Sequence, residues 1–157
     1  MRWAVEFGQI DINLEIALSS RYLTQPRHGH IDQVFHNFSF LKSYAKSKLV
    51  FDPFKNDFDG KFTAYDWEDF YFEVQEYFPE NAPEARGDSV IMTQFVDADH
   101  AGDMMNRRSH TVIIIYVYRD PVMWYSKKQN TVESGAFGSE IVDMLTGMEL
   151  TKGLHLF

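Results

Sequence analysis

The run of β-branched and aromatic residues TVIIIYVY, at positions 111–118, is the feature that most constrains the fold. Such side chains favour extended backbone, and a continuous apolar run of this length is typical of a strand buried on both faces. The run therefore predicts a buried strand in the C-terminal half of the chain.

Two further strands and a helix are predicted around this run. VIMTQFVD (90–97) precedes it, and VMWYSKK (122–128) follows a turn at Arg119-Asp120-Pro121. Connections this short favour antiparallel neighbours. Apolar side chains then recur at helical spacing, at Phe137, Ile141, Met144, Leu145 and Met148. The expected order from residue 90 onward is strand, strand, strand, helix.

The N-terminal part predicts a helical hairpin made of residues 10–23 and 31–46. The second helix has an apolar stripe at Ile31, Val34, Phe35, Phe38, Leu41, Tyr44 and Ala45. Pro26 and Gly29 mark the turn between the helices. LVFDP (49–53) is then expected to form a short strand that ends at the proline. Helices and antiparallel strands together predict an α+β fold.

The net charge of −8 lies in one middle segment. Residues 52–88 hold eleven acids and three bases, whereas the rest of the chain holds twelve of each. Within it, YDWEDFYFEVQEYF (65–78) has the pattern of an amphipathic helix, and PENAPEARGD (79–88) that of a loop. We therefore expect a helical segment at 1–51, an acidic aromatic connection at 52–89 and a strand-rich unit at 90–157.

Composition narrows the class of protein. The chain has no cysteine, which excludes disulfides and thiolate metal sites and fits an intracellular protein. No apolar stretch reaches the length of a signal peptide or a membrane span, so a soluble protein is expected. The electrically neutral flanks leave a nucleic-acid surface open as a function.

Asp97 ends the first predicted strand of the C-terminal unit, and Asp99 follows two residues later. Both are candidate ligands of a hard divalent cation. Two-metal phosphoryl chemistry needs several such carboxylates from different elements. On the sequence pattern alone, an Asp-rich turn after a strand is the favoured interpretation of these two residues. A third hypothesis is that the two aspartates form the metal–nucleotide clamp of a glycosyltransferase, but the chain shows no second sequence motif for binding a sugar nucleotide.

Glu140 is the candidate partner of Asp97. On a helix with ~100° per residue, Glu140 falls at the edge of the apolar stripe, whereas Asp143 and Glu149 point away from it. A carboxylate on the core-facing side needs a partner, and a metal shared with Asp97 would supply one. A side chain that reaches water or a lysine is the alternative. The metal hypothesis predicts that the Asp97 and Glu140 carboxylates lie close together.

The remaining ionisable residues give weaker signals. The six histidines show no convincing metal-ligand spacing. Lys127 and Lys128, with Arg107 and Arg108, form small basic clusters that could contact phosphates or simply solvate a sheet edge.

Four stretches in register resemble the ribonuclease H domain of copia-type LTR retrotransposon polyproteins. They are FVDADHAGD, the following RRSHT, WYSKKQ, and SEIVDM on the predicted helix. The N-terminal EFGQIDINLEIALSSRYLTQPRHGHIDQVFHNFSFLKSY is similar to the helical segment that follows the reverse-transcriptase palm in the same polyproteins. YDWEDFY and PENAPEARG are similar to the joining region of one branch, so the resemblance covers nearly the whole chain.

The resemblance implies residue roles. Asp97 matches the first catalytic aspartate and Glu140 the catalytic glutamate, which in the family bind two Mg²⁺ ions and help to cleave the RNA strand of an RNA–DNA hybrid. Lys127, Lys128 and Gln129 become candidate substrate contacts. The implied partners are the hybrid and the remainder of the polyprotein, with no membrane, and the implied location is the cytoplasm or a virus-like particle.

Departures from the family pattern shape the expected activity. The family's next catalytic aspartate follows the helix on a strand that lies beyond Phe157, and Val112 stands where a glycine is usual. The chain thus holds two of the about four ligands that two-metal hydrolysis uses. We expect a fragment that spans the end of a reverse transcriptase and the first half of a ribonuclease H domain, inactive alone and prone to self-association through an unpaired sheet edge. A non-catalytic remnant that binds protein or nucleic acid is the competing interpretation.

Overall fold

The structure is a computed structural model of the chain, and it describes residues 1–52, 54, 80–81, 84, 87 and 90–155. The N-terminal part holds α1 (Arg2–Glu6), the short 3-10 helix η1 (Ile10–Ile12), α2 (Asn13–Ser20) and α3 (His28–Ser43). The C-terminal part holds β1 (Met92–Asp99), β2 (His110–Val117), β3 (Asp120–Lys128) and α4 (Ala136–His155). The predicted α+β class and the order strand, strand, strand, helix are confirmed.

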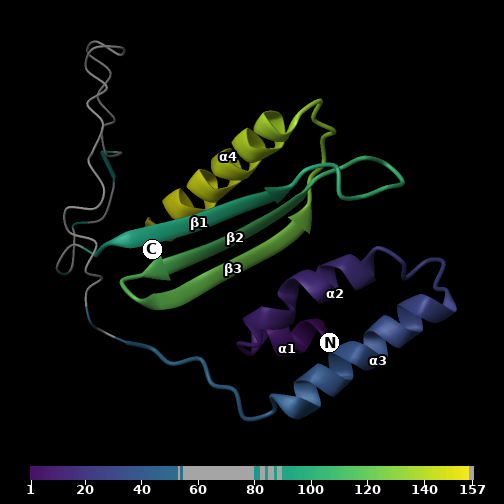
Figure 1. Cartoon of the computed structure of the whole chain (residues 1–157). Coiled ribbons are helices and arrows are strands. Elements are labelled where there is room, and N and C mark those ends of the chain that lie inside the picture. Colours follow the sequence, from purple (N-terminus) through teal and green to yellow (C-terminus); the bar gives the residue numbers. More distant parts are fainter. Residues whose placement is uncertain (53, 55–79, 82–83, 85–86, 88–89, 156–157) are drawn as a thin grey trace.

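The three strands form one antiparallel sheet in the order β1-β2-β3, with helices on its two faces (Figure 1). Two consecutive residues of β2 show the layering, because neighbours along a strand point to opposite faces. The Thr111 hydroxyl donates a hydrogen bond to Asp143 of α4, and the His110 ring contacts Arg21 at the end of α2. The sheet therefore lies between α4 and the N-terminal helices.

The predicted strand at 111–118 is the central strand β2, but its two faces are not buried equally. Thr111, Ile113 and Ile115, which face α4, are buried, whereas Val112 and Ile114 on the opposite face are half-buried. The N-terminal helices reach that opposite face mainly through β3, which leaves it partly open over β1 and β2.

The N-terminal helices pack through a small apolar cluster. Ala4, Val5 and Ile12 are its buried members, and Ile16, Phe40, Leu41 and the β3 residue Trp124 pack against it. α3 begins three residues earlier than predicted, at His28, because the His30 ring accepts a hydrogen bond from the Arg27 backbone N–H (3.1 Å). Much of the α3 stripe, including Phe35 and Phe38, lies at the surface.

The expected short strand at 49–53 is wrong for its described part. Residues 47–52 have no regular secondary structure. The segment is held instead by side chains of the β2–β3 turn. The Asp52 backbone N–H donates to the Asp120 carboxylate, and the Asp52 carboxylate pairs with Arg119 (3.2 Å).

α4 confirms the predicted helix but packs through the other side. The predicted apolar residues Phe137, Ile141, Met144, Leu145 and Met148 are all exposed, and Ser139, Asp143 and Gly147 are buried against the sheet. A Cβ on Gly147 would lie 2.9 Å from Val96 Cγ1 of β1, so the helix approaches the strand as closely as a glycine allows. The prediction that Asp143 points away from the core is therefore wrong.

The acidic connection contributes little to the described structure. The predicted amphipathic helix at 65–78, with Trp67, Phe70, Tyr71, Val74 and Phe78 on one face, lies outside the described residues. Most of the predicted loop at 79–88 lies outside them too. Among the helices that the structure describes, none combines the length and the apolar character needed to cross a membrane.

Candidate functional site

Asp97 lies on β1, on the sheet face opposite α4. Its pairing partner is Val112 of β2. Gln94 and Val96, three positions and one position before Asp97, lie against Gly147 of α4, and side chains an odd number of positions apart on a strand point to opposite faces. The Asp97 side chain is thus exposed on the face that the N-terminal helices leave partly open. Asp99 lies on the same face, beside His110.

Glu140 lies in the second turn of α4, directly after the buried Ser139, and is half-buried. Burial is the main reason why the pKa of Asp143 is raised, and the Glu140 and Asp97 charges raise it further, so both carboxylates lie within electrostatic range of that one buried group. Among the described residues, no group of three or more His, Asp or Glu side chains is arranged to hold a metal ion. The contact expected between the Asp97 and Glu140 carboxylates stays a prediction.

Asp143 is the ionisable residue that the sequence patterns missed. It is completely buried. Its Oδ1 accepts hydrogen bonds from the Thr111 hydroxyl and from Gln129 Nε2 (2.7 Å), whereas its Oδ2 has no partner among the described residues. Burial raises the pKa of Asp143, and the two hydrogen bonds oppose that change only in part. The one available signal was the spacing of Ser139, Asp143 and Gly147, which places small and polar residues four apart along one side of the helix.

The candidate substrate contacts at the end of β3 and directly after it lie in three different environments. Gln129 is buried, and besides Asp143 its Nε2 bonds to the Ser139 carbonyl oxygen (3.0 Å). Lys128 is half-buried, and its Nζ pairs with Asp103 Oδ2 (3.0 Å). Lys127 is exposed. Gln129 therefore fastens α4 to the sheet, and Lys127 is the most accessible of the three to a ligand.

Asp103 organises the loop between β1 and β2. Its Oδ1 accepts from the Met105 backbone N–H (3.0 Å), and its Oδ2 accepts from Lys128. Its backbone closes the loop, because its N–H donates to the Arg108 carbonyl (3.1 Å) and its carbonyl accepts from the Arg107 N–H (2.7 Å). The Lys128 hydrogen bond is the main reason why the pKa of Asp103 is lowered. These partners make Asp103 a structural residue of the loop.

His110 and Ser126 are side by side, but their arrangement does not suit nucleophilic catalysis. Arg21 Nη2 lies 2.5 Å from His110 Nδ1, and His110 Nε2 lies 2.8 Å from Ser126 Oγ. Because a guanidinium can only donate, Nδ1 is an acceptor, and the neutral ring carries its proton on Nε2. Burial, with the Arg21 charge, lowers the pKa of His110 to about 4. His110 therefore donates to Ser126 and does not remove its proton.

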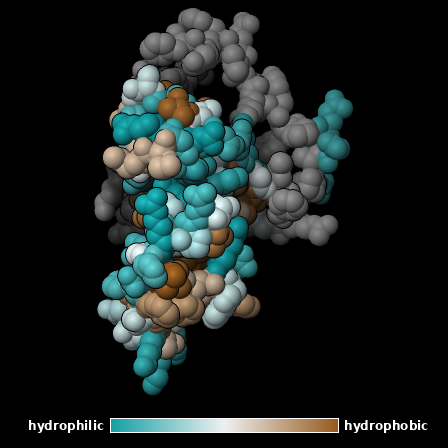
Figure 2. Space-filling model, turned by 90° about the vertical axis from the view of Figure 1, so that its right-hand side faces the viewer, coloured by the Kyte–Doolittle hydropathy of each residue, from teal (hydrophilic) through white to brown (hydrophobic). Residues whose placement is uncertain are grey.

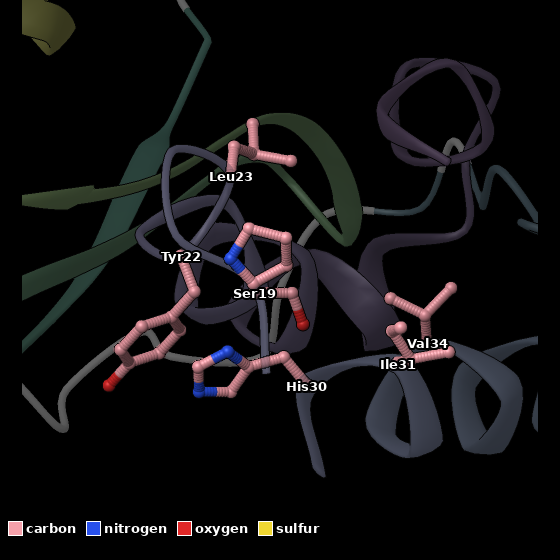
Figure 3. A pocket seen from close by; sticks show the side chains of 7 residues that line it. Ser19, Tyr22, Leu23, His30, Ile31 and Val34 are labelled. Atoms are coloured by element: carbon pink, nitrogen blue, oxygen red, sulfur yellow. The ribbon is translucent and has the colours of Figure 1, made fainter. Parts of the chain in front are cut away.

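A small pocket of about 180 Å³ opens where α2 meets α3 (Figure 3). The Tyr22 and His30 rings form one wall and are stacked with their centroids 4.0 Å apart. Ile31 and Val34 of α3 line the opposite part of the pocket, so its interior is mainly apolar.

Comparisons of this chain with protein-family models, with curated proteins and with solved structures found no match.

Proposed function

We propose that this chain derives from the reverse transcriptase and ribonuclease H region of a copia-type retrotransposon polyprotein and binds nucleic acid without cleaving it efficiently. The observation that carries the proposal is the placement of the two matched carboxylates. Asp97 lies on the first strand of the sheet and Glu140 on the helix that follows its third strand. Both carboxylates lie within electrostatic range of the buried Asp143. The four sequence stretches in register support the same origin.

The available metal ligands favour a protein that binds nucleic acid over one that hydrolyses it. Asp97 and Glu140 are the residues that would hold Mg²⁺, which when bound would stabilise the charge on the scissile phosphate. Two-metal hydrolysis uses about four converging ligands. The described residues do not fit such a site, because strand alternation directs Asp97 away from α4 and no third acid or histidine completes a cluster with them. The proposed partners are an RNA–DNA hybrid and the remainder of the polyprotein, inside a virus-like particle.

The test is to incubate the chain with a labelled RNA–DNA hybrid and Mg²⁺ and to measure binding and cleavage together. We expect binding with little cleavage. Asp97→Asn should leave binding unchanged, as should Glu149→Gln, which removes an exposed acid elsewhere on α4. Efficient cleavage that Asp97→Asn abolishes and Glu149→Gln preserves would overturn the claim of inactivity. Failure of the chain to bind the hybrid at low salt would overturn the proposal itself.

A second candidate function is protein binding through α4. Its exposed apolar residues are Phe137, Ile141, Met144, Leu145 and Met148, on one side of the helix. Contiguous apolar surface on a helix marks interaction sites in many proteins. Sedimentation of the chain with and without Ile141→Ser and Met148→Ser would show whether this side drives self-association.

A further inference from the structure

The β1–β2 loop exposes two methionines to solvent, and hydrogen bonds within the loop close it. Met104 and Met105 are 81% and 89% exposed. The hydrogen bonds of Asp103 and its ion pair with Lys128 fix the loop on both sides of them. Arg107 has a left-handed backbone, with φ at 58°, which is uncommon for a residue with a side chain. The loop is thus a defined projection, and its tip carries apolar side chains next to Arg107 and Arg108.

This loop and the α2–α3 turn meet at one end of the molecule. Arg21 is the first residue after α2, His110 is the first residue of β2, and they are in contact at 2.5 Å. Figure 1 shows both connections at the same end of the sheet, and Figure 2 views that end directly. Hydrophilic side chains dominate it and separate smaller hydrophobic areas (Figure 2).

The charge of this end differs from that of the chain. Its connections are residues 21–30, 99–110 and 127–135, and they hold six bases, Arg21, Arg27, Arg107, Arg108, Lys127 and Lys128, against three acids, Asp99, Asp103 and Glu133. Six minus three gives +3, whereas the whole chain carries −8. Local positive charge on an acidic protein favours a polyanionic partner.

We infer that this end is the nucleic-acid contact surface of the chain, where Arg107 and Arg108 bind phosphates and Met104 and Met105 touch the bases. The inference rests on the proposed function and names the surface that performs it. Arginine side chains position a protein on the nucleic-acid backbone. Exposed methionines can insert between base steps in the minor groove, which a purely electrostatic surface does not do.

An acidic protein segment is the other polyanion that such a surface would attract, and the geometry favours nucleic acid. Met104 and Met105 are almost fully exposed on a loop that the Asp103 backbone closes by hydrogen bonds, and exposed apolar side chains presented in this way suit stacked bases. The stacked Tyr22 and His30 rings offer a further aromatic surface at the same end.

The experiment measures affinity for a fluorescein-labelled RNA–DNA hybrid in EDTA, so that cleavage is absent, between about 50 and 200 mM salt. Arg107→Gln with Arg108→Gln should lower the slope of log K against log salt by about 1.8, since each phosphate contact contributes about 0.9. The matched control is Arg2→Gln with Arg119→Gln, which removes the same charge from exposed positions outside this end. The control should leave the slope within about 0.3 of the wild type.

The role of the methionines is tested by asking whether their contribution to binding requires nucleic-acid bases. Met104→Ser with Met105→Ser should weaken hybrid binding about tenfold without changing the salt slope, and should leave binding of heparin, a polyanion without bases, unchanged. Met144→Ser with Met148→Ser removes two exposed methionines from α4 and serves as the control for that change. Circular dichroism of each variant confirms that the fold is retained.

The outcomes separate the two proposals. Wild-type protein that fails to bind the hybrid refutes the proposed function together with this surface. Wild-type protein that binds, with loop variants that behave like their controls, refutes only the surface. Equal losses for heparin and hybrid in the methionine variant would show a surface for polyanions in general, such as acidic protein segments, and would also refute the base contact.

Discussion

The two sides of the sheet are packed by different chemistry. On one side the N-terminal helices bury Ala4, Val5 and Ile12 beside Trp124, and a polar contact joins Arg21 to His110. On the other side α4 presents Ser139, Asp143 and Gly147 to the strands and turns its apolar residues to solvent. In the first interface both the helices and the sheet contribute apolar side chains. In the second, β2 contributes the buried Ile113 and Ile115, whereas α4 contributes close approach and hydrogen bonds.

Each side also buries an ionisable group, which is a base on one side and an acid on the other. Burial lowers the pKa of the base His110 and raises the pKa of the acid Asp143, so both are favoured in the neutral form. Acidification should therefore weaken the N-terminal side, and rising pH should weaken the α4 side. A protein with this arrangement has its two faces destabilised at opposite ends of the pH range.

The largest expected effect tests close approach on the α4 side. Gly147→Val would place side-chain atoms where Gln94 and Val96 already lie, since even a Cβ there comes within 2.9 Å of Val96. We expect a loss of about 3 kcal/mol in the free energy of unfolding, measured by urea denaturation. Gly153→Val is the matched control, because nothing lies within 4 Å of a Cβ at that position of the same helix. Equal stability of the two variants would show that α4 does not pack tightly on β1.

The next effect tests the N-terminal side through pH. The folded pKa of His110 is about 4 against an ordinary 6.5, so between these values the unfolded chain binds the proton more readily. The stabilisation from neutral His110 is complete above about pH 6.5 and is lost as the pH falls toward 4, by about 3 kcal/mol in total. His110→Gln keeps an acceptor for Arg21 and a donor for Ser126 but does not titrate. Urea denaturation of this variant should lose that pH dependence, and a slope equal to the wild type would refute the role of His110.

The sequence pattern predicted β2 and α4 but not the orientation of α4. The β-branched and aromatic residues at 111–118 identified β2, and the three- and four-residue spacing from Phe137 identified the helix. The same spacing assigned the apolar side of α4 to the core. That assignment failed because Gly147 permits close contact and because Thr111 and Gln129, far away in sequence, supply hydrogen bonds to Asp143.

The candidate site shows the same division between local and long-range information. Asp97 could be placed at the end of β1 from its position after an apolar run, and β1 does contain it. The loop role of Asp103 depends on Lys128, twenty-five positions away on β3, and the burial of Gln129 depends on α4. Partners at that separation leave no periodic signal in a single sequence.

The smallest expected effect tests the buried acid on the α4 side and has the opposite sign. Because the folded pKa of Asp143 is raised, the folded chain keeps its proton more readily, and stability falls as pH rises from about 3.8 through that raised value. Asp143→Asn keeps an oxygen for Thr111 and Gln129 and replaces the buried, unpartnered Oδ2 with an NH₂ group, which carries no charge. We expect this variant to be more stable than the wild type by about 1 kcal/mol at neutral pH, with the difference shrinking below pH 4.

Thr111→Val provides the contrast, because it removes a donor from Asp143 and should destabilise by about 1 kcal/mol at neutral pH. If Asp143→Asn were destabilising at neutral pH, the carboxylate would be stabilised in its charged form, and the opposition between the two sides of the sheet would not hold.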